Sequence, residues 1–502
     1  MAKRKKRNAF TLVSLLFVMV LLIGFYIWNG KRKKASDAEK EDSKAEENIT
    51  VASIDSEQVK TVHYIGKDAD ITLTLIDGET WISEAEPERP INQQYVKNMV
   101  NQVKKVDARR ILSENAENLA EYGLDHPKAY LQVTLQDNST LTLQIGDESS
   151  GISGCYALVN EDNKVYLLNS TYRTGLDFSD LDFTAVEDGP DITAAGIDFI
   201  QVLKRDGEDF ELLNDKDNKY KQTSKMYPWV ITKPYEEGYA ADSSKISDLQ
   251  ANYSSFDFVN CVDYSGKDLA RYGLEDPAAS IYIKYFETHT ETLEEPETDP
   301  ETGEEIKEKT TYEDKEYRIY VGNQEEDGNY YVRREGSDYV YTMRKTDISK
   351  MLETDPFELM SKFICIPSID TVDRIDIDIN GTAYTMEIKR ETLTDEEGKE
   401  ETQASYYYNG SKVEEDAFKE VYKKMIAVGY DAKAEEKVNT VGIKPTMTIR
   451  YHIVGEGETT LTASFLPYDD SFYLVDTGHT IRFFADKRQV DDVAKAVKEL
   501  IP

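Results

Sequence analysis

The stretch LAEYGLDHP at residues 119–127 returns as LARYGLEDP at residues 269–277, so one nine-residue motif occurs twice with an offset of 150 residues. Each copy runs into a segment of alternating apolar and polar residues, KAYLQVTL (128–135) or AASIYIKY (278–285), which is the pattern of a half-buried strand. Three further strand-like segments follow each copy in the same order and end at residues 146, 159 and 168, or at 322, 333 and 343. The motif and its strands therefore form a repeated unit.

A third, weaker copy begins at GIKP (442–445) and continues into TMTIRYHI, FYLV and IRFF. Upstream of each copy lie two hairpin-like strands, an aromatic strand and an amphipathic helix. The apolar stripes of these helices are Ile91, Tyr95, Val96, Met99, Val100 and Val103; Ile246, Leu249, Tyr253 and Phe256; and Val413, Ala417, Phe418, Val421, Tyr422 and Met425. A Ser411/Glu414 capping box is expected to open the third helix. The pattern predicts an α+β fold of three tandem repeats, each with three strands, one helix and four strands of mainly antiparallel sheet.

A single long apolar segment lies near the amino terminus. Residues 9–28 are twenty consecutive uncharged, mostly apolar positions, and as a helix they span about 30 Å, the thickness of a bilayer's hydrocarbon core. The alternative is a cleaved signal peptide, whose apolar region is shorter and ends in small residues. Here the segment ends in Phe25, Tyr26 and Trp28. We expect a retained, single-pass transmembrane helix.

Basic residues on both sides of this segment predict its orientation. Five of them (residues 3–7) and the amino terminus precede it, and four (residues 31–34) follow it. Because basic residues favour the cytoplasmic side, we expect a cytoplasmic amino terminus and an extracytoplasmic body at the cell membrane. The expected organisation is a basic terminus and anchor (1–34), a flexible tether (35–50), repeat 1 (56–185), repeat 2 with an acidic insertion (192–362, insertion 287–316) and a degenerate repeat 3 (368–502).

Charge excludes one class of function. The formal net charge is −36, yet all the residues of 1–34 that carry charge are basic, so the rest of the chain is even more acidic. Such a body repels phosphate polymers and anionic headgroups, and no nucleic-acid partner is expected. The insertion 287–316 holds thirteen acids and three lysines, and it is expected to be a solvated loop. The cysteines, Cys155, Cys261 and Cys365, are odd in number and far apart, which allows one disulfide or three buried thiols.

The repeated motif has a structural interpretation. A glycine after a short helical turn adopts the left-handed conformation, and a proline that follows launches an extended strand. We therefore expect Gly123 and Gly273 to end such turns, Pro127 and Pro277 to start strands, and Tyr122 and Tyr272 to pack over the corner. The alternative is that these six residues form part of a binding surface.

Other motifs give no catalytic, cofactor or metal site. Residues Asp376–Glu387 match a calcium-loop pattern, but Asn380-Gly381 stands between two alternating segments, which predicts a hairpin instead. The five histidines lie in different segments, and no nucleophile elbow, zinc or phosphate-loop motif is present. The run Tyr406–Tyr408 is interpreted as an edge strand, with stacking on a sugar ring as the alternative.

The anchor, the strand tryptophans Trp81 and Trp229, the L-A-x-Y-G-L-[DE]-x-P motif and the glycine-ending strand together resemble a bacterial family, domain of unknown function 4340. The first two copies carry the resemblance, and the third lacks the Leu-Ala-x-Tyr stretch. The family has no established activity. Its members are often associated with ABC-type export systems linked to gliding motility, so the resemblance implies an accessory role beside a permease and its ATPase.

Three hypotheses for function follow. The first is a non-catalytic, membrane-anchored interaction module, an accessory component of an ABC-type exporter. The second is a cell-wall or glycan-binding protein that uses tyrosine-rich clefts. The third is an unrecognised hydrolase that uses scattered acidic residues. Nothing in the sequence identifies an enzyme, and no cofactor is expected.

Overall fold

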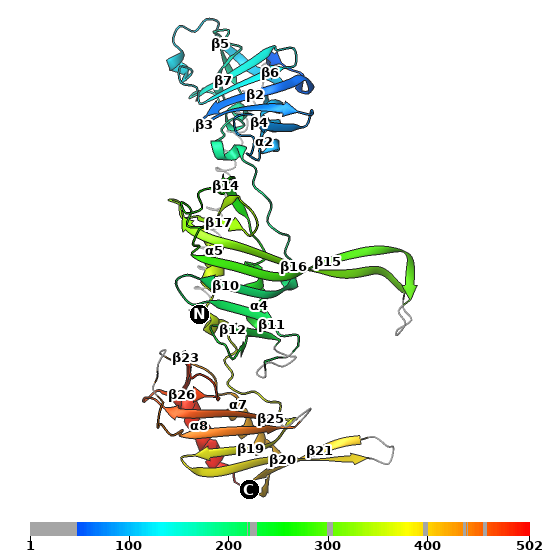
Figure 1. Cartoon of the computed structure of the whole chain (residues 1–502), viewed down its shortest axis with the longest axis vertical. Helices are drawn as coiled ribbons and strands as arrows, with labels where there is room; N and C mark the ends of the chain where they lie inside the picture. Colours follow the sequence, from blue (N-terminus) through cyan, green and yellow to red (C-terminus); the bar gives the residue numbers. More distant parts are fainter. Residues whose placement is uncertain are drawn as a thin grey trace, which may run out of the picture. The chain divides into compact units, whose positions relative to one another are not determined.

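The computed structural model describes residues 48–217, 219–220, 228–298, 305–394, 400–434, 438, 440–454 and 459–501 (Figure 1). These residues form three nine-stranded sheets. The predicted anchor (9–28) and most of the predicted tether lie outside the described residues. Within the described ranges, no helix is both long enough and apolar enough to cross a membrane.

Each sheet uses a consecutive set of strands. Sheet 1 contains β1 (Ile49–Ser53), β2 (Val59–Gly66), β3 (Ala69–Ile76), β4 (Thr80–Ser83), β5 (Lys105–Ser113), β6 (Ala129–Leu135), β7 (Thr140–Glu148), β8 (Cys155–Val159) and β9 (Val165–Leu168). Sheet 2 contains β10 (Ile197–Lys204), β11 (Phe210–Asn214), β12 (Trp229–Lys233), β13 (Tyr239–Ala240), β14 (Phe258–Asp263), β15 (Ala279–Thr298), β16 (Glu305–Gln324), β17 (Tyr330–Arg334) and β18 (Val340–Met343). Sheet 3 contains β19 (Val372–Ile379), β20 (Thr382–Thr394), β21 (Glu400–Tyr408), β22 (Ser411–Val413), β23 (Ala432–Lys433), β24 (Met447–Ile453), β25 (Thr459–Pro467), β26 (Phe472–Asp476) and β27 (Phe483–Asp486).

Strand order shows that the three sheets have one topology. The orders are β1-β5-β9-β8-β7-β6-β2-β3-β4, then β14-β18-β17-β16-β15-β10-β11-β12-β13, then β23-β27-β26-β25-β24-β19-β20-β21-β22. Eight strands correspond one to one, and only the ninth differs: β1 joins one edge of sheet 1, whereas β13 and β22 join the opposite edge of the other two. The third repeat therefore has the same architecture as the others, and the tandem-repeat prediction is confirmed.

The register of the central strands is also the same. Gly66 of β2 pairs with Ala129 of β6, Lys204 of β10 pairs with Ala279 of β15, and Ile379 of β19 pairs with Met447 of β24. Because a shift of one residue would turn every side chain to the other face, this shared register keeps the same face buried in each repeat.

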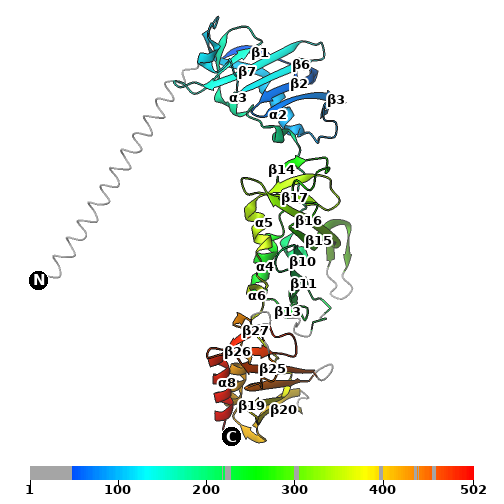
Figure 2. The ribbon, with the colours of Figure 1, turned by 60° about the vertical axis from the view of Figure 1, so that its left-hand side comes forward.

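Helices cover one face of each sheet. A helix follows the first strands, namely α2 (Gln93–Val103), α4 (Ser243–Asn252) or α7 (Glu415–Ile426), and another follows the last strand, namely α3 (Ser170–Thr174), α5 (Lys345–Leu352) or α8 (Lys487–Glu499). Figure 2 shows α4 and α5 along one side of sheet 2 and α8 along sheet 3. The predicted stripe of α2 forms the core of repeat 1, since Val96, Met99 and Val103 are fully buried.

Several details of the sequence prediction were wrong. Each repeat has a further strand directly after its first helix (β5, β14 or β23), where mixed polar sequence hides the alternation. The predicted tether ends too late, because Ile49 and Thr50 already belong to β1, which pairs with β5. The capping box is absent as well: Ser411 lies in β22, and α7 has Glu414 as its N-cap with no side-chain hydrogen bond.

The acidic insertion is not a loop. Its described residues continue β15 and β16 as a long two-stranded ribbon that extends away from the rest of sheet 2 (Figure 1). Thr290 and Thr310 are cross-strand neighbours with their hydroxyl oxygens 3.4 Å apart, and Lys315 lies 2.6 Å from Glu313. Threonine favours strands, and paired lysines reduce the repulsion between acids, so backbone pairing prevails over solvation.

The described chain divides into two compact units. One comprises the described part of residues 1–188 together with 258–268 and 338–342, and the other comprises 189–257, 269–337 and 343 onward. Repeats 1 to 3 are thus not three separate compact units, because the second unit contains all of sheet 3 and most of sheet 2.

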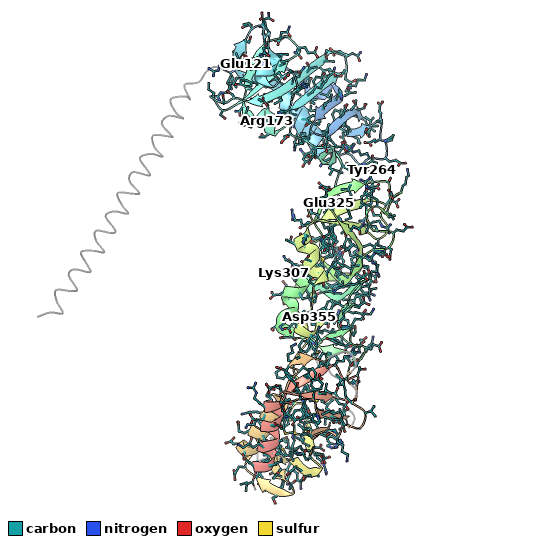
Figure 3. The ribbon with its side chains drawn as sticks, turned by 90° about the vertical axis from the view of Figure 1, so that its left-hand side faces the viewer. Glu121, Arg173, Tyr264, Lys307, Glu325 and Asp355 are labelled. Carbon is teal, nitrogen blue, oxygen red and sulfur yellow. The ribbon has the colours of Figure 1, made fainter. Side chains whose placement is uncertain are left out.

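An aromatic cluster within the second unit joins sheet 3 to residues of repeat 2. The ring of Phe483 on β27 lies 5.3 Å from that of Tyr239, 5.4 Å from those of Tyr235 and Phe357, and 4.9 Å from that of Tyr430. Phe357 belongs to α6 (Pro356–Leu359), which is capped by Asp355 (labelled in Figure 3).

Backbone bonds extend this connection. The segment after α6 hydrogen bonds to both repeats, since the Ser361 amide donates to the Ala240 carbonyl and the Tyr430 amide donates to the Lys362 carbonyl. Sheets 2 and 3 are therefore joined by both packing and backbone hydrogen bonds.

We predict that Phe483→Ala lowers the free energy of unfolding by about 3–5 kcal/mol, because a fully buried ring at the centre of the cluster is lost. Urea denaturation followed by circular dichroism measures the change. Tyr468→Ala is the control: this ring is 45% exposed and packs on Phe484, outside the cluster, so a change below about 1 kcal/mol is expected. Equal effects of the two substitutions would contradict the role of the cluster.

Candidate functional site

The repeated motif forms a tight corner in repeat 1. Leu119–Tyr122 make one turn of 3-10 helix, and Gly123 follows with a φ of +64°, in the left-handed region. The Gly123 amide donates to the Ala120 carbonyl, and the Leu124 amide donates to the Leu119 carbonyl at 3.0 Å. A side chain at Gly123 would be strained by the backbone, which explains why glycine occupies this position.

A second glycine allows the corner to lie against the sheet. A Cβ atom at Gly146 on β7 would lie only 2.2 Å from the carbonyl oxygen of Tyr122. A Cβ at Gly123 would lie 2.6 Å from the carboxyl of Asp147, the next residue of that strand. The corner and the strand therefore approach as backbone against backbone, and Leu124 is buried in a small second core with Leu158 and Val165.

Repeat 2 reproduces this geometry. Gly273 has a φ of +69°, and the Leu274 amide donates to the Leu269 carbonyl at 2.9 Å. A Cβ at Gly322 would lie 2.1 Å from the Tyr272 carbonyl oxygen. The motif therefore occupies the same place in both sheets.

The third repeat keeps the glycine but loses the tyrosine. Gly442 has a φ of +82°, and the Ile443 amide donates to the Thr440 carbonyl. Val441, which stands directly before this glycine, is 91% exposed. Repeat 3 therefore keeps a left-handed glycine turn, but a Cβ at Gly442 would have nothing within 4 Å, so the close contact with the sheet is not repeated there.

The tyrosines of the motif pack on rings of the neighbouring strand. Tyr122 contacts Tyr156 edge to face at 5.1 Å, and Tyr272 contacts Tyr331 at 5.0 Å. Pro127 lies two residues before the start of β6, and Pro277 lies two residues before the start of β15. These contacts are structural, although Pro127 also lines a shallow groove of about 340 Å³ with His126 and Arg173.

The calcium-like stretch is a hairpin. Asn380 and Gly381 have φ values of +52° and +81°, as a two-residue turn of this class requires, and they connect β19 to β20. Asp376, the first residue of the calcium pattern, lies on the strand and accepts a hydrogen bond at 2.8 Å from His452. The hairpin interpretation is therefore confirmed.

The tyrosines of β21 and the three cysteines are explained by packing. Tyr406 and Tyr408 are buried in β21, which is not the edge strand because β22 lies beyond it, so neither ring faces solvent for stacking. Cys155, Cys261 and Cys365 are free thiols. Burial raises the pKa of Cys155 to about 11 and those of Cys261 and Cys365 to about 12, so all three are protonated and unreactive at neutral pH.

One group with metal-ligand chemistry was missed. Glu287 and His289 on β15 and Glu313 on β16 have ligand atoms within 4.8 Å of one another. The signal was an E-x-H stretch on one strand of the insertion, but its partner is found only once the ribbon register pairs Glu287 with Glu313. Lys315, 2.6 Å from Glu313, already neutralises part of this charge.

Comparison with known families supports the resemblance. The family described as "Domain of unknown function (DUF4340)" matches residues 81–228 and 229–441, and the chain belongs to this family. The two matches begin at Trp81 on β4 and Trp229 on β12, which are equivalent strands. The second match ends before β24, so the last strands of sheet 3 lie outside it. No curated protein and no solved structure matches the chain.

We predict that Gly123→Val destabilises the first unit by about 2–3 kcal/mol. A β-branched residue in the left-handed region costs about 1–3 kcal/mol, and the added atoms meet Asp147. Gly151→Val is the matched control, because a Cβ there has nothing within 4 Å. Urea unfolding of both variants decides: if Gly123→Val costs no more than Gly151→Val, the corner is not a constraint.

Proposed function

We propose that the protein is a non-catalytic interaction module, anchored in the cell membrane by residues 9–28, with its body on the extracytoplasmic side. Its proposed partner is a membrane complex of the ABC type, a permease with its ATPase. The observation that carries the proposal is the threefold use of one framework whose repeated motif residues serve packing. A chain built in this way offers one framework three times with different surface residues, which suits binding.

The amino-terminal sequence supports the membrane location. Twenty apolar positions and the flanking basic residues have the length and charge of a single-pass anchor. The sixteen residues of 35–50 give the body a reach of about 20–25 Å as a flexible coil, less where β1 has begun. A body held this close to the bilayer is suited to membrane-protein partners.

The β15–β16 ribbon supports the choice of binding over catalysis. It extends beyond the sheet, and it carries the most acidic segment of the chain, with thirteen acids against three lysines in 287–316. Tyr312 on the ribbon is 68% exposed. Such a surface favours a partner with basic extracytoplasmic loops, whose approach it would steer.

The family supplies the identity of the proposed partner. Members resembling this chain are associated with ABC-type export systems, and membership is established for most of its length. The hydrolase alternative gains nothing from His63 and His452, because each forms a hydrogen bond with an aspartate on a sheet face and, among the described residues, neither imidazole is hydrogen-bonded to a nucleophilic side chain.

Topology gives the first test. We expect protease added to intact spheroplasts to digest the protein beyond about residue 50 and to leave the amino-terminal part in the membrane fraction. The mature protein is expected to begin at or near Met1. Immunoblots with tags at both ends measure this. Protection of the body until lysis would reverse the orientation, and a new terminus near Ala35 would mean a cleaved signal peptide.

Co-isolation gives the second test. We expect affinity isolation in mild detergent to recover a multi-span permease and its ATPase, with recovery falling as salt rises because the contact is between opposite charges. Replacing residues 289–311 by Asn-Gly, which closes the ribbon at the Thr288–Tyr312 pair, should reduce recovery at least several-fold.

The control for this test neutralises acids elsewhere. Glu117→Gln, Glu121→Gln and Asp125→Asn remove three exposed charges near the first corner, and recovery should be unchanged. Isolation of the protein alone in several mild detergents, together with binding to isolated peptidoglycan or turnover of a glycan, would contradict the accessory role.

A further inference from the structure

A groove of about 550 Å³ is lined by residues of α2 and α3, on the helical side of sheet 1. Figure 2 labels these two helices. It is larger than the corresponding groove of repeat 3, which has about 340 Å³, and α3 has only 5 residues whereas α8 has 13. The short helix leaves the outer side of α2 uncovered between Tyr95 and Gln102. The volume falls within the range of about 300–1,000 Å³ that is typical of small-ligand sites.

The lining of this groove is nearly uncharged. Of its ten residues, only Lys105 carries a charge, in a chain in which 31% of residues are charged. The corresponding groove of repeat 3, between α7 and α8, is lined by Glu420, Lys424, Asp492, Lys495 and Glu499 among others. Neutrality is therefore not a consequence of the shared topology.

Aromatic rings form one wall. Tyr95 stacks on Phe178 with ring centroids 5.2 Å apart and an angle of 28° between the rings. Phe178 rests in turn on Tyr64 and Phe183, both buried, at 5.9 Å from each. The Tyr64 hydroxyl donates a hydrogen bond to the Leu176 carbonyl and accepts one from the Phe178 amide. The aromatic wall is therefore held against the core without a ligand.

Amide and hydroxyl side chains form the rest. Asn98, Asn101 and Gln102 line the groove from α2, and Thr171 and Thr174 line it from α3. Gln102 lies over the end of α3 because Gly175 makes room for it: a Cβ there would be 2.3 Å from the Gln102 Nε2 atom. Carboxamides both donate and accept hydrogen bonds, as sugar hydroxyls do, and ring faces suit the apolar face of a pyranose.

We propose that this groove binds a neutral oligosaccharide, with Tyr95 as the stacking ring and Asn98, Asn101 and Gln102 as the hydrogen-bonding groups. The chain's strong negative charge disfavours acidic polysaccharides. The inference does not rest on the accessory role proposed above, because a glycan contact by repeat 1 leaves the ribbon and the rest of the chain available to a membrane partner.

Calorimetric titration of the full-length protein tests the proposal, in a detergent without a sugar headgroup. The probes are chitotetraose and maltohexaose as neutral oligosaccharides and tetragalacturonic acid as the acidic one. We expect at least one neutral probe to bind and the acidic probe to bind more weakly. Tyr95→Ala and the exposed-site variant Asn101→Ala should each weaken binding about tenfold, and Gly175→Ala should weaken it by displacing Gln102.

The matched controls lie in the groove of repeat 3. Lys424 and Asp492 line the equivalent groove of repeat 3. The variants Lys424→Ala and Asp492→Ala should therefore leave binding unchanged. Circular dichroism spectra show whether each variant is folded. If Tyr95→Ala does not fold, Asn101→Ala still tests the proposal. The proposal is overturned if neither neutral probe binds, if only the acidic probe binds, or if binding survives Tyr95→Ala and Asn101→Ala together in a folded protein.

Discussion

The close contact between the motif corner and a glycine of the neighbouring strand is the constraint that repeats 1 and 2 share. In sheet 1 the Tyr122 carbonyl lies over Gly146, and in sheet 2 the Tyr272 carbonyl lies over Gly322, at distances that no Cβ atom would permit. The contact places the start of β6 or β15 beside its partner strands in one register. Because register decides which face is buried, this contact helps to keep the helices of repeats 1 and 2 on one side of their sheets. Repeat 3 reaches the same register with Leu466 in place of the strand glycine.

Much of this framework could be predicted from local sequence, for physical reasons. Gly123 and Gly273 were expected in the left-handed region because only glycine adopts it without cost, and Asn380-Gly381 indicated a hairpin in place of a calcium loop. The ribbon was missed because the many acids of 287–316 favour a solvated loop. The threonines that pair across the two strands favour a ribbon, and their pairing depends on a register that the sequence does not reveal. Strands β5 and β14 were missed because mixed polar sequence hides the alternation of their side chains, and β23 was missed because it has only 2 residues.

Surface chemistry differs among the repeats although their topology does not. Arg89 of repeat 1 and Tyr239 of repeat 2 are separated by the same 150 residues as the two motifs. Arg89 is buried and forms ion pairs with Glu86 and Asp180. Tyr239 lies instead in the aromatic cluster around Phe483. Glu86 also accepts a hydrogen bond from the hydroxyl of Tyr264, which is labelled in Figure 3. The neutral lining of the groove of repeat 1 is likewise specified by no motif. Such sites become visible only when equivalent positions are compared in three dimensions, so the sequence predicted the framework better than its surfaces.

The central claim is that the corner is a fixed, repeated element of the folded sheets. Residue-resolved amide hydrogen exchange tests it most directly, because the amides of Leu124 and Leu274 donate to the carbonyls of Leu119 and Leu269. The account predicts that both amides exchange as slowly as the central-strand amides of their own sheets, since opening the corner requires unfolding the sheet. Exchange of either amide at the rate of an unstructured peptide, while the central strands stay protected, would contradict it.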